Sequence, residues 1–316
     1  MPACSSMDAG VHLPQLDLAG EGLSHRRLAD AVDAARESGF VAISANDHFF
    51  FGAPWLDGPT ILAAALERAG QMTLATTVAL PTLRGPVPLA KALLALHVLS
   101  GGRVIAGLGP GSSRLDYDAV GVDYEQRWPR FEEAVLLVRA LLHGATPSLP
   151  DRYYPVPQAH MSPLPAQAGA IPIWIGSWGS TAGLRRVARL GDGWLASAYN
   201  TSPAGFADAM NLLRRELKAA GREADSFPHA LVTMWTWITE DRREAELIID
   251  ARLAPLTNRK PSTLRGRLCV GPAQMCADLL SEYASAGCRR VHFWPVGDER
   301  RQIELLATDV LPLVAA

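Results

Sequence analysis

The sequence predicts an α/β protein built as a (β/α)₈ barrel of the TIM type, with insertions in the loops that follow the strands. Short apolar runs of strand length alternate eight times with amphipathic stretches of helix length along 316 residues. Several of these runs are apolar on both faces, as expected of parallel strands with helices outside and side chains inside. No long antiparallel run interrupts the alternation, so a closed barrel fits better than a doubly wound sheet.

Four strand–helix units are expected in the first half of the chain. Ser24 occupies an N-cap position before an apolar face at helical spacing, and Gly39 closes that helix. Pro129 opens the fourth helix, whose apolar side follows the same spacing. The strands are expected at residues 10–13, 40–45, 72–78 and 103–108, and the helices at 24–39, 61–69, 87–99 and 129–142.

Four further units complete the expected barrel. The strands are expected at residues 171–175, 193–197, 230–238 and 290–294, and the helices at 181–190, around 210–213, at 272–286 and at 301–311. Two segments, 144–170 and 240–271, are longer than a connection requires. Segments of that length are usually lids or small added elements with a function.

Composition limits the classes of partner. A net charge of −2 gives no electrostatic reason to expect nucleic acid or an anionic membrane as a partner. The chain has no apolar run long enough to span a bilayer and no signal-peptide pattern at its start. Its four cysteines lack CxxC spacing, and its eight histidines lack metal-ligand spacing. We therefore expect a cytoplasmic protein with reduced thiols and no metal.

Candidate functional residues follow the strands, because the working face of such a barrel lies at the carboxyl ends of its strands. The second strand ends at Asn46-Asp47-His48, the fourth in "GLGPGSS" (107–113) and the fifth in "IGSWGST" (175–181). This rim predicts a pocket for a large, flat, partly anionic ligand and for a substrate with an apolar part. The aromatic residues expected there are Phe49, Phe50, Phe51, Trp55, Trp178 and Trp294.

His48 is the candidate proton carrier or hydrogen-bond donor, because imidazole titrates near neutral pH. Asp47 is the second candidate catalytic residue, expected to orient the ring of His48 or to raise its pKa. The alternative is a histidine whose hydrogen bonds are satisfied within its own loop. His12 and His97 are expected to be structural or peripheral.

The junction after the fifth strand is a candidate phosphate site. A strand passes through a glycine-bearing loop directly into a helix, whose free N–H groups and dipole attract an anion. Gly176 and Gly179 permit close approach of the backbone, and Ser177, Ser180 and Thr181 add hydroxyl donors. The alternative is an ordinary strand-to-helix turn in which Ser180 is only the helix cap.

The segment "GLGPGSS" matches a dinucleotide-binding motif only weakly. Its third glycine, Gly111, comes one residue early, and Pro110 interrupts the turn. The next clear helix is expected only near Trp128. A loop that lies beside a flat cofactor ring explains the segment better.

Four motifs resemble the bacterial luciferase-like monooxygenase superfamily, from about Val11 to Trp294. They are "ANDHFF", "GRVIAGLGPGSSRLDYDAVGVDY", "RFEEAVLLVRALL" and "IPIWIGSWGSTAGLRRVARLGDGWLAS". The resemblance implies a single luciferase-like barrel domain over residues 1–316, which uses FMN or the deazaflavin coenzyme F420. It also implies a homodimer, which exposed apolar faces on the second and third helices would allow.

The resemblance also assigns site residues. It implies that His48, in its Asp47-His48 pair, lies near the reactive face of the deazaflavin ring, and that the Thr77–Val78 peptide bond is cis and forms a bulge behind the ring. The loop Gly109, Pro110, Gly111 and Ser112 is expected beside the ring. The cofactor phosphate is expected at Gly176, Ser177, Trp178, Gly179, Ser180 and Thr181.

Two details bear on the reaction. The sugar-phosphate dehydrogenases of this superfamily have a glutamate at the position of Ser112. Serine is a poor general acid, so both a sugar-phosphate substrate and proton transfer by the residue at position 112 are in question. FMN-using branches more often end the second strand in Glu-His, so Asp47-His48 favours F420. The expected function is hydride transfer between F420 and a small organic substrate. The alternatives are an FMN-dependent monooxygenase supplied by a flavin reductase, and a flavin-binding barrel without turnover.

Overall fold

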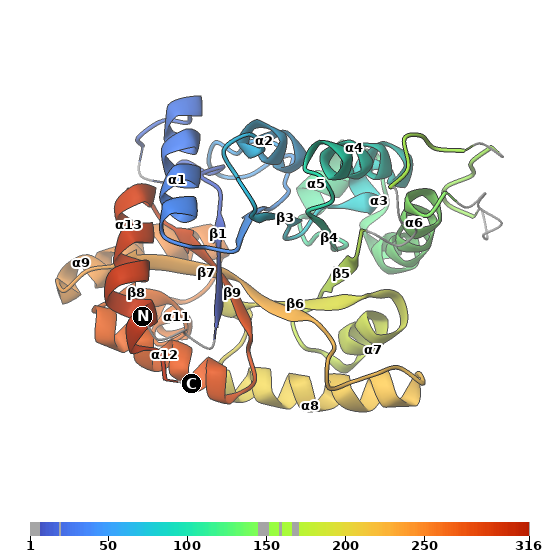
Figure 1. Ribbon diagram of the computed structural model, residues 1–316. Helices are drawn as coiled ribbons and strands as arrows, with labels where there is room; N and C mark the ends of the chain where they lie inside the picture. The colour runs from blue at the N-terminus through green and yellow to red at the C-terminus, as the bar shows by residue number, and fades with distance from the viewer. Residues whose placement is uncertain (1–6, 19, 145–151, 158–159, 166–170, 316) are drawn as a thin grey trace.

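The computed structural model describes residues 7–18, 20–144, 152–157, 160–165 and 171–315. Eight parallel strands form a closed barrel with helices outside it, which confirms the predicted fold class (Figure 1). Neighbours around the barrel follow the chain, and the last strand pairs with the first. The eight strands are β1 (Asp8–His12), β2 (Ala42–Ala45), β3 (Thr73–Thr76), β4 (Val104–Leu108), β5 (Ile173–Gly176), β6 (Gly193–Ser197), β7 (His229–Ile238) and β9 (Arg290–Pro295).

A ninth strand, β8 (Cys269–Gly271), was not predicted. It pairs in parallel with the end of β7, at Thr236–Ile238, and adds to the barrel without closing it. Three residues are too few to show a period in the sequence. The strand ends the long segment 240–271, which also contains the short helices α9 (Arg242–Leu247), α10 (Ala254–Thr257) and α11 (Pro261–Leu264) and a π-helical stretch, Ile248–Leu253.

The eight predicted long helices are all present, with ends shifted by a few residues. They are α1 (His25–Glu37), α2 (Gly58–Ala65), α4 (Pro86–Leu99), α6 (Arg127–Leu142), α7 (Thr181–Leu190), α8 (Pro203–Ala219), α12 (Ala273–Ser285) and α13 (Glu299–Leu305), the last continued by a π-helical stretch, Leu306–Val310. Outside the segment 240–271, two short helices were also missed, α3 (Pro81–Arg84) and α5 (Arg114–Ala119). The expectation of no clear helix before Trp128 is therefore wrong.

The barrel interior is filled by large side chains that face glycines. A Cβ atom on Gly10 would lie 2.9 Å from the ring of His292, and one on Gly193 would lie 2.6 Å from the ring of Trp174. His292 Nδ1 lies 2.9 Å from the hydroxyl of Ser44. Burial lowers the pKa of His292 to about 3, so this ring is neutral and is a packing element.

His12 and His97 are both buried, in agreement with a structural role. His12 stacks on Trp294 with ring centroids 4.2 Å apart. Cys269, Cys276 and Cys288 are buried free thiols, whereas Cys4 lies outside the described residues. Within the described ranges, no helix combines the length and apolarity needed to cross a membrane. The expected insertion 144–170 lies partly outside those ranges.

Candidate functional site

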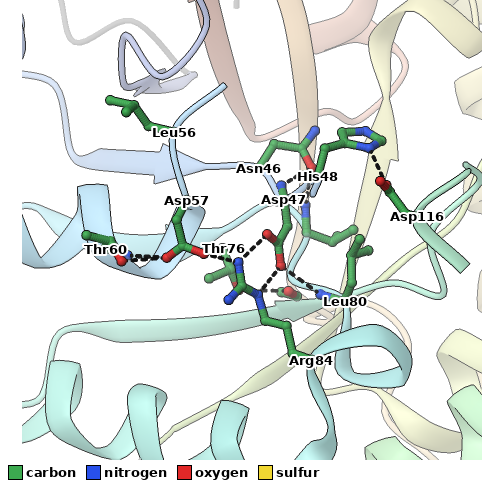
Figure 2. A network of polar contacts seen from close by, with 12 residues as sticks. Asn46, Asp47, His48, Leu56, Asp57, Thr60, Thr76, Leu80, Arg84 and Asp116 are labelled. Atoms are coloured by element: carbon green, nitrogen blue, oxygen red, sulfur yellow. Dashed lines mark hydrogen bonds and ion pairs between the residues drawn. The ribbon is translucent and has the colours of Figure 1, made fainter. Parts of the chain in front are cut away.

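The end of β2 places His48 beside a carboxylate that sequence reasoning missed. His48 Nδ1 lies 2.9 Å from Asp116 Oδ2, although 68 residues separate the two in the chain (Figure 2). Asp116 is 1% exposed and also accepts a hydrogen bond of 2.8 Å from the N–H of Phe50. The expectation that Asp47 orients His48 is therefore wrong.

Asp47 instead binds a guanidinium on the other side of the strand end. Arg84 Nε and Nη2 donate to its two carboxylate oxygens at 2.6 Å each, and the N–H of Leu80 donates at 3.3 Å (Figure 2). Arg84 also pairs with Asp57. Burial raises the pKa of Asp47, and the charge of Arg84 offsets part of that rise. Asp47 thus attaches α3 to the end of β2.

The short helix α5 explains the position of Asp116. Ser113 caps this helix and accepts a hydrogen bond of 3.2 Å from the N–H of Asp116. The hydroxyl of Tyr117, the next residue, donates to the carbonyl of Pro110 and ties the helix to the loop before it. A serine followed three residues later by an acid is a helix-start signal, so "SRLD" could have revealed this element.

The hydrogen bond to Asp116 determines which tautomer of His48 is present. Burial raises the pKa of Asp116, but hydrogen bonds from His48 and from the N–H of Phe50 outweigh it and lower the pKa below its usual range. An ionised carboxylate only accepts, so Nδ1 carries the proton of the neutral ring. Nε2 forms no hydrogen bond with any residue that the structure describes. It is therefore available to exchange a proton with a ligand.

Aromatic rings enclose His48. Phe51 and Trp55 each lie with their ring centroids 5.0 Å from the imidazole. The rings of Trp55 and Trp294 contact each other with centroids 5.7 Å apart, and Trp294 stacks on Trp235 with centroids 4.1 Å apart. Of the aromatic residues expected at the rim, Phe51, Trp55 and Trp294 form this group. Phe49 packs instead against the cluster of Leu80, Leu83 and Tyr117, and Phe50 and Trp178 are exposed.

The Thr77–Val78 bond is a non-prolyl cis peptide, which confirms the expectation from the resemblance. The N–H of Val78 donates to Asn46 Oδ1 at 3.3 Å, so this turn is joined to the residues before His48. A Cβ atom on Gly109 would lie 2.5 Å from a Val78 methyl, and one on Gly176 would lie 3.0 Å from the other. Three predicted cofactor residues, Val78, Gly109 and Gly176, therefore meet at one place, which we call the Val78 shelf.

Thr77, which directly follows β3, is buried, and its N–H donates a hydrogen bond of 2.8 Å to the carbonyl of Ala45.

The rest of the strand-four loop turns away toward α5. Gly111 has a φ of +80°, a backbone conformation that glycine adopts without strain. The side chain of Ser112 is exposed, so it joins neither His48 nor the Val78 shelf.

The loop between β5 and α7 presents unsatisfied backbone donors. Ser180 caps α7 by accepting a hydrogen bond of 3.2 Å from the N–H of Gly183, and Gly179 has a φ of +91°. The N–H groups of Ser180, Thr181 and Ala182 have no hydrogen-bond partner among the described residues. Ser177 Oγ accepts from the N–H of Gly179 at 3.3 Å. The serine cap does not exclude an anion site at this loop, because the cap uses only the third N–H donor of the helix.

No group of three or more His, Cys, Asp or Glu side chains in the described ranges is arranged to hold a metal ion.

Replacing Arg84 by methionine is expected to lower the free energy of unfolding by about 2–3 kcal/mol, because the buried carboxylate of Asp47 loses its partner. The cost is below that of a fully enclosed pair, since Arg84 keeps 17% of its side chain exposed. Urea unfolding measures the change, and adding Asp47→Asn should recover part of it. Arg114→Met is the control, because the Arg114–Glu125 pair is 60% and 70% exposed and should change stability by about 0.5 kcal/mol or less. Equal effects from both arginines would contradict the prediction.

Comparison with protein families gives one match that covers most of the chain. Residues 7–257 match the model for luciferase-like monooxygenases. The closing strand β9 lies beyond the matched part.

Curated relatives are similar over differing lengths. An F420-dependent glucose-6-phosphate dehydrogenase of Intrasporangium calvum is 32% identical over 192 residues, which span 56% of this chain and 55% of that protein. The chain thus matches about half the length of that relative. A protein of the same name from Nocardia farcinica is 26% identical over an alignment of 94% of this chain and 96% of its own.

Solved structures share the fold at lower identity. An F420-dependent secondary alcohol dehydrogenase, solved in complex with an F420–acetone adduct, has a TM-score of 0.84 and 16% identity. The alignment covers 98% of this chain and 99% of that one. The monooxygenase RslO1 from Streptomyces bottropensis has a TM-score of 0.83 and 20% identity, with 98% and 100% covered.

Proposed function

The chain belongs to the luciferase-like monooxygenase family, and from this premise we propose that it is an oxidoreductase that uses coenzyme F420 to oxidise or reduce a small organic substrate. One observation carries the proposal: an imidazole at the end of β2 with Nδ1 fixed by Asp116 and Nε2 free. The relatives and the structural neighbour named for F420 support the choice of cofactor.

The cofactor is proposed to lie between two features of the barrel rim. The N–H groups of Ser180, Thr181 and Ala182, with the hydroxyls near them, suit its phosphate because they lack protein partners. The Val78 shelf is proposed to support a flat ring, because Gly109 and Gly176 leave room for the two methyl groups of Val78 to pack closely against the backbone there. When bound, the deazaflavin ring supplies or accepts the hydride.

His48 is proposed as the group that moves the proton. During oxidation of an alcohol, its Nε2 accepts the hydroxyl proton as the C–H bond breaks, and in the reverse direction it returns that proton to the carbonyl oxygen. The carboxylate of Asp116 stabilises the imidazolium formed in between, as the orienting acid does in other His–Asp pairs. Asp47 is a positioning residue in this scheme, since its contacts are with Arg84 and Leu80.

The substrate is proposed to be an uncharged alcohol or ketone with an apolar part. Phe51 and Trp55 surround His48, and Arg84, the cation bound at the end of this strand, is already paired with two carboxylates. A sugar phosphate would need a free cation and, by the family pattern, a general acid at position 112, where the serine is exposed.

Fluorescence titration of the purified protein with F420 and with FMN tests the cofactor, and spectrophotometric assay with secondary alcohols or ketones tests the reaction. We expect saturable binding of F420 and substrate-dependent change in its absorbance. Oxygen consumption with reduced FMN would instead support a monooxygenase supplied by a reductase. Binding without turnover of any substrate would support a storage or sensing barrel, and binding of neither cofactor would defeat the proposal.

A homodimer is also proposed. Val87, Val98 and Leu99 on α4 are 37%, 47% and 68% exposed, and apolar side chains gathered on one helix suit contact with a second copy. Light scattering after size exclusion measures the mass, and a monomer at micromolar concentration would contradict the proposal.

A further inference from the structure

The loop that carries His48 is held in place by side chains from other parts of the chain. It covers residues 46–57, between β2 and α2, and the structure describes all of it. No backbone hydrogen bond joins two residues of this loop. A functional side chain on such a loop keeps its geometry only through supporting contacts. A side chain that holds the loop therefore also determines where the imidazole lies.

One of these side chains is Gln15, which no step of the proposed reaction uses. Gln15 follows β1 and is completely buried, with an exposed fraction of 0%. Its Oε1 accepts a hydrogen bond of 2.6 Å from the N–H of Asn46, and its Nε2 donates to the carbonyls of Asn46 and Leu56 at 2.9 and 3.1 Å. The N–H of Leu56 donates to the carbonyl of Gln15 at 2.8 Å. One buried residue thus joins the two ends of the loop.

Gln15 is connected to the proposed reacting groups through Asn46. His48 comes two residues after Asn46 in the chain (Figure 2). The side chain of Asn46 accepts a hydrogen bond of 2.7 Å from the N–H of Asp47 and one of 3.3 Å from the N–H of Val78. Asn46 therefore links the loop of His48 to the Val78 shelf. A displacement of Asn46 would change the spacing between the imidazole and a ring lying on that shelf.

We propose that Gln15 is a positioning residue that fixes the distance between the imidazole of His48 and the cofactor ring. The inference rests on the proposed function and deepens it. Gln15 acts through the backbone of the loop, because its side-chain hydrogen bonds all go to backbone groups of Asn46 and Leu56. A misplacement of about 1 Å can lower a rate by about 10²-fold. Loss of these hydrogen bonds should therefore reduce turnover although His48 itself is still present.

Gln15→Met tests the proposal, because methionine has about the length of glutamine and cannot form the three hydrogen bonds. Turnover with F420 should fall by about 10- to 100-fold. The dissociation constant of F420 should stay within about threefold, since the N–H groups proposed to hold the phosphate belong to the β5–α7 loop. The proton NMR signal of His48 Nδ1–H should shift or broaden, because the ring moves relative to Asp116.

Gln302→Met is the matched control. Gln302 is 2% exposed, and its carboxamide also binds one backbone residue in both directions. Its Oε1 accepts the N–H of Ile238 at 2.6 Å, and its Nε2 donates to the carbonyl of Ile238 at 3.3 Å. This contact joins α13 to the end of β7 and does not involve the loop of His48. Both variants should lower the midpoint of urea unfolding, but only Gln15→Met should lower turnover and change the signal of His48.

A folded Gln15→Met variant with unchanged turnover and an unchanged His48 signal would overturn the inference. Equal losses of turnover in Gln15→Met and Gln302→Met would also overturn it, since turnover would then follow stability alone. Amide hydrogen exchange of the wild-type protein tests the contact even if Gln15→Met does not fold. The N–H of Asn46 should exchange as slowly as those of β2, and rapid exchange would contradict the inference.

The proposed function and this inference can fail separately. If the wild-type protein binds F420 but turns over no alcohol or ketone, the proposed function fails. The His48 signal in Gln15→Met, compared with that in Gln302→Met, then still decides whether Gln15 positions the imidazole. If turnover is found and the signal is the same in both variants, the proposed function stands and the role of Gln15 is refuted.

Discussion

Turnover with F420 should fall by about 10²- to 10⁴-fold in His48→Ala, while the dissociation constant of the cofactor stays within about twofold. The two quantities separate because different groups govern them. Proton transfer needs Nε2 of His48, whereas the groups proposed to hold the cofactor are backbone N–H donors of the β5–α7 loop and the Val78 shelf. Steady-state kinetics and fluorescence titration measure the two effects.

The control for this variant is His25→Ala, because His25 is exposed at the start of α1. It should leave both turnover and affinity unchanged. Added imidazole should restore part of the activity of His48→Ala, since the variant leaves a space lined by Phe51 and Trp55. A variant that keeps full turnover would show that His48 is a packing residue, and parallel loss of turnover and cofactor binding would show that it holds the ring.

The parts of the fold that sequence reasoning located best are those with strong local signals. The bounds of α7 (Thr181–Leu190) and β6 (Gly193–Ser197) match the prediction because Ser180 caps the helix and Gly191 ends it. β8 and α5 were missed, since three and six residues carry too little periodicity. β8 depends on pairing with the far end of β7, which no local pattern reveals.

The candidate site was predictable where its chemistry follows from one segment of chain. The loop from Gly176 to Thr181 and the imidazole at the end of β2 are of this kind. The partner of His48 was not, because Asp47 and His48 lie beyond the end of β2 and their partners lie 37 and 68 residues away in the chain. Asp47 binds Arg84, and the carboxylate that contacts the imidazole, Asp116, comes from the helix α5 (Figure 2).

Asp116→Asn should lower turnover by roughly 10²-fold with little change in the affinity for cofactor. The tautomer of His48 that is protonated on Nε2 becomes available, and the imidazolium loses the negative charge that stabilises it. The amide can present either oxygen or nitrogen to Nδ1, so the ring is no longer held with Nδ1 protonated and Nε2 free. Asp118→Asn is the matched control. It lies two residues along the same helix, is exposed and does not contact His48.

Two measurements distinguish this role from a purely structural one. The wild-type protein should show a proton NMR signal for His48 Nδ1–H that disappears in Asp116→Asn and persists in Asp118→Asn. The contribution of Asp116 to the free energy of unfolding should also decrease as the pH falls. Because the folded protein lowers the pKa of Asp116 below its ordinary value of 3.8, its contribution to the free energy of unfolding is complete above that pH and is lost as the pH falls through the folded-state value.

The difference in unfolding free energy between the wild-type protein and Asp116→Asn should therefore be about 1–3 kcal/mol at neutral pH and should shrink below about pH 4. The difference in unfolding free energy between the wild-type protein and Asp118→Asn should not shrink below that pH. If Asp116→Asn loses stability equally at all pH values and keeps both the Nδ1–H signal and its turnover, the carboxylate does not act through the imidazole. His48 would then be oriented by its aromatic neighbours Phe51 and Trp55 alone, and the proton-relay scheme would have to be abandoned.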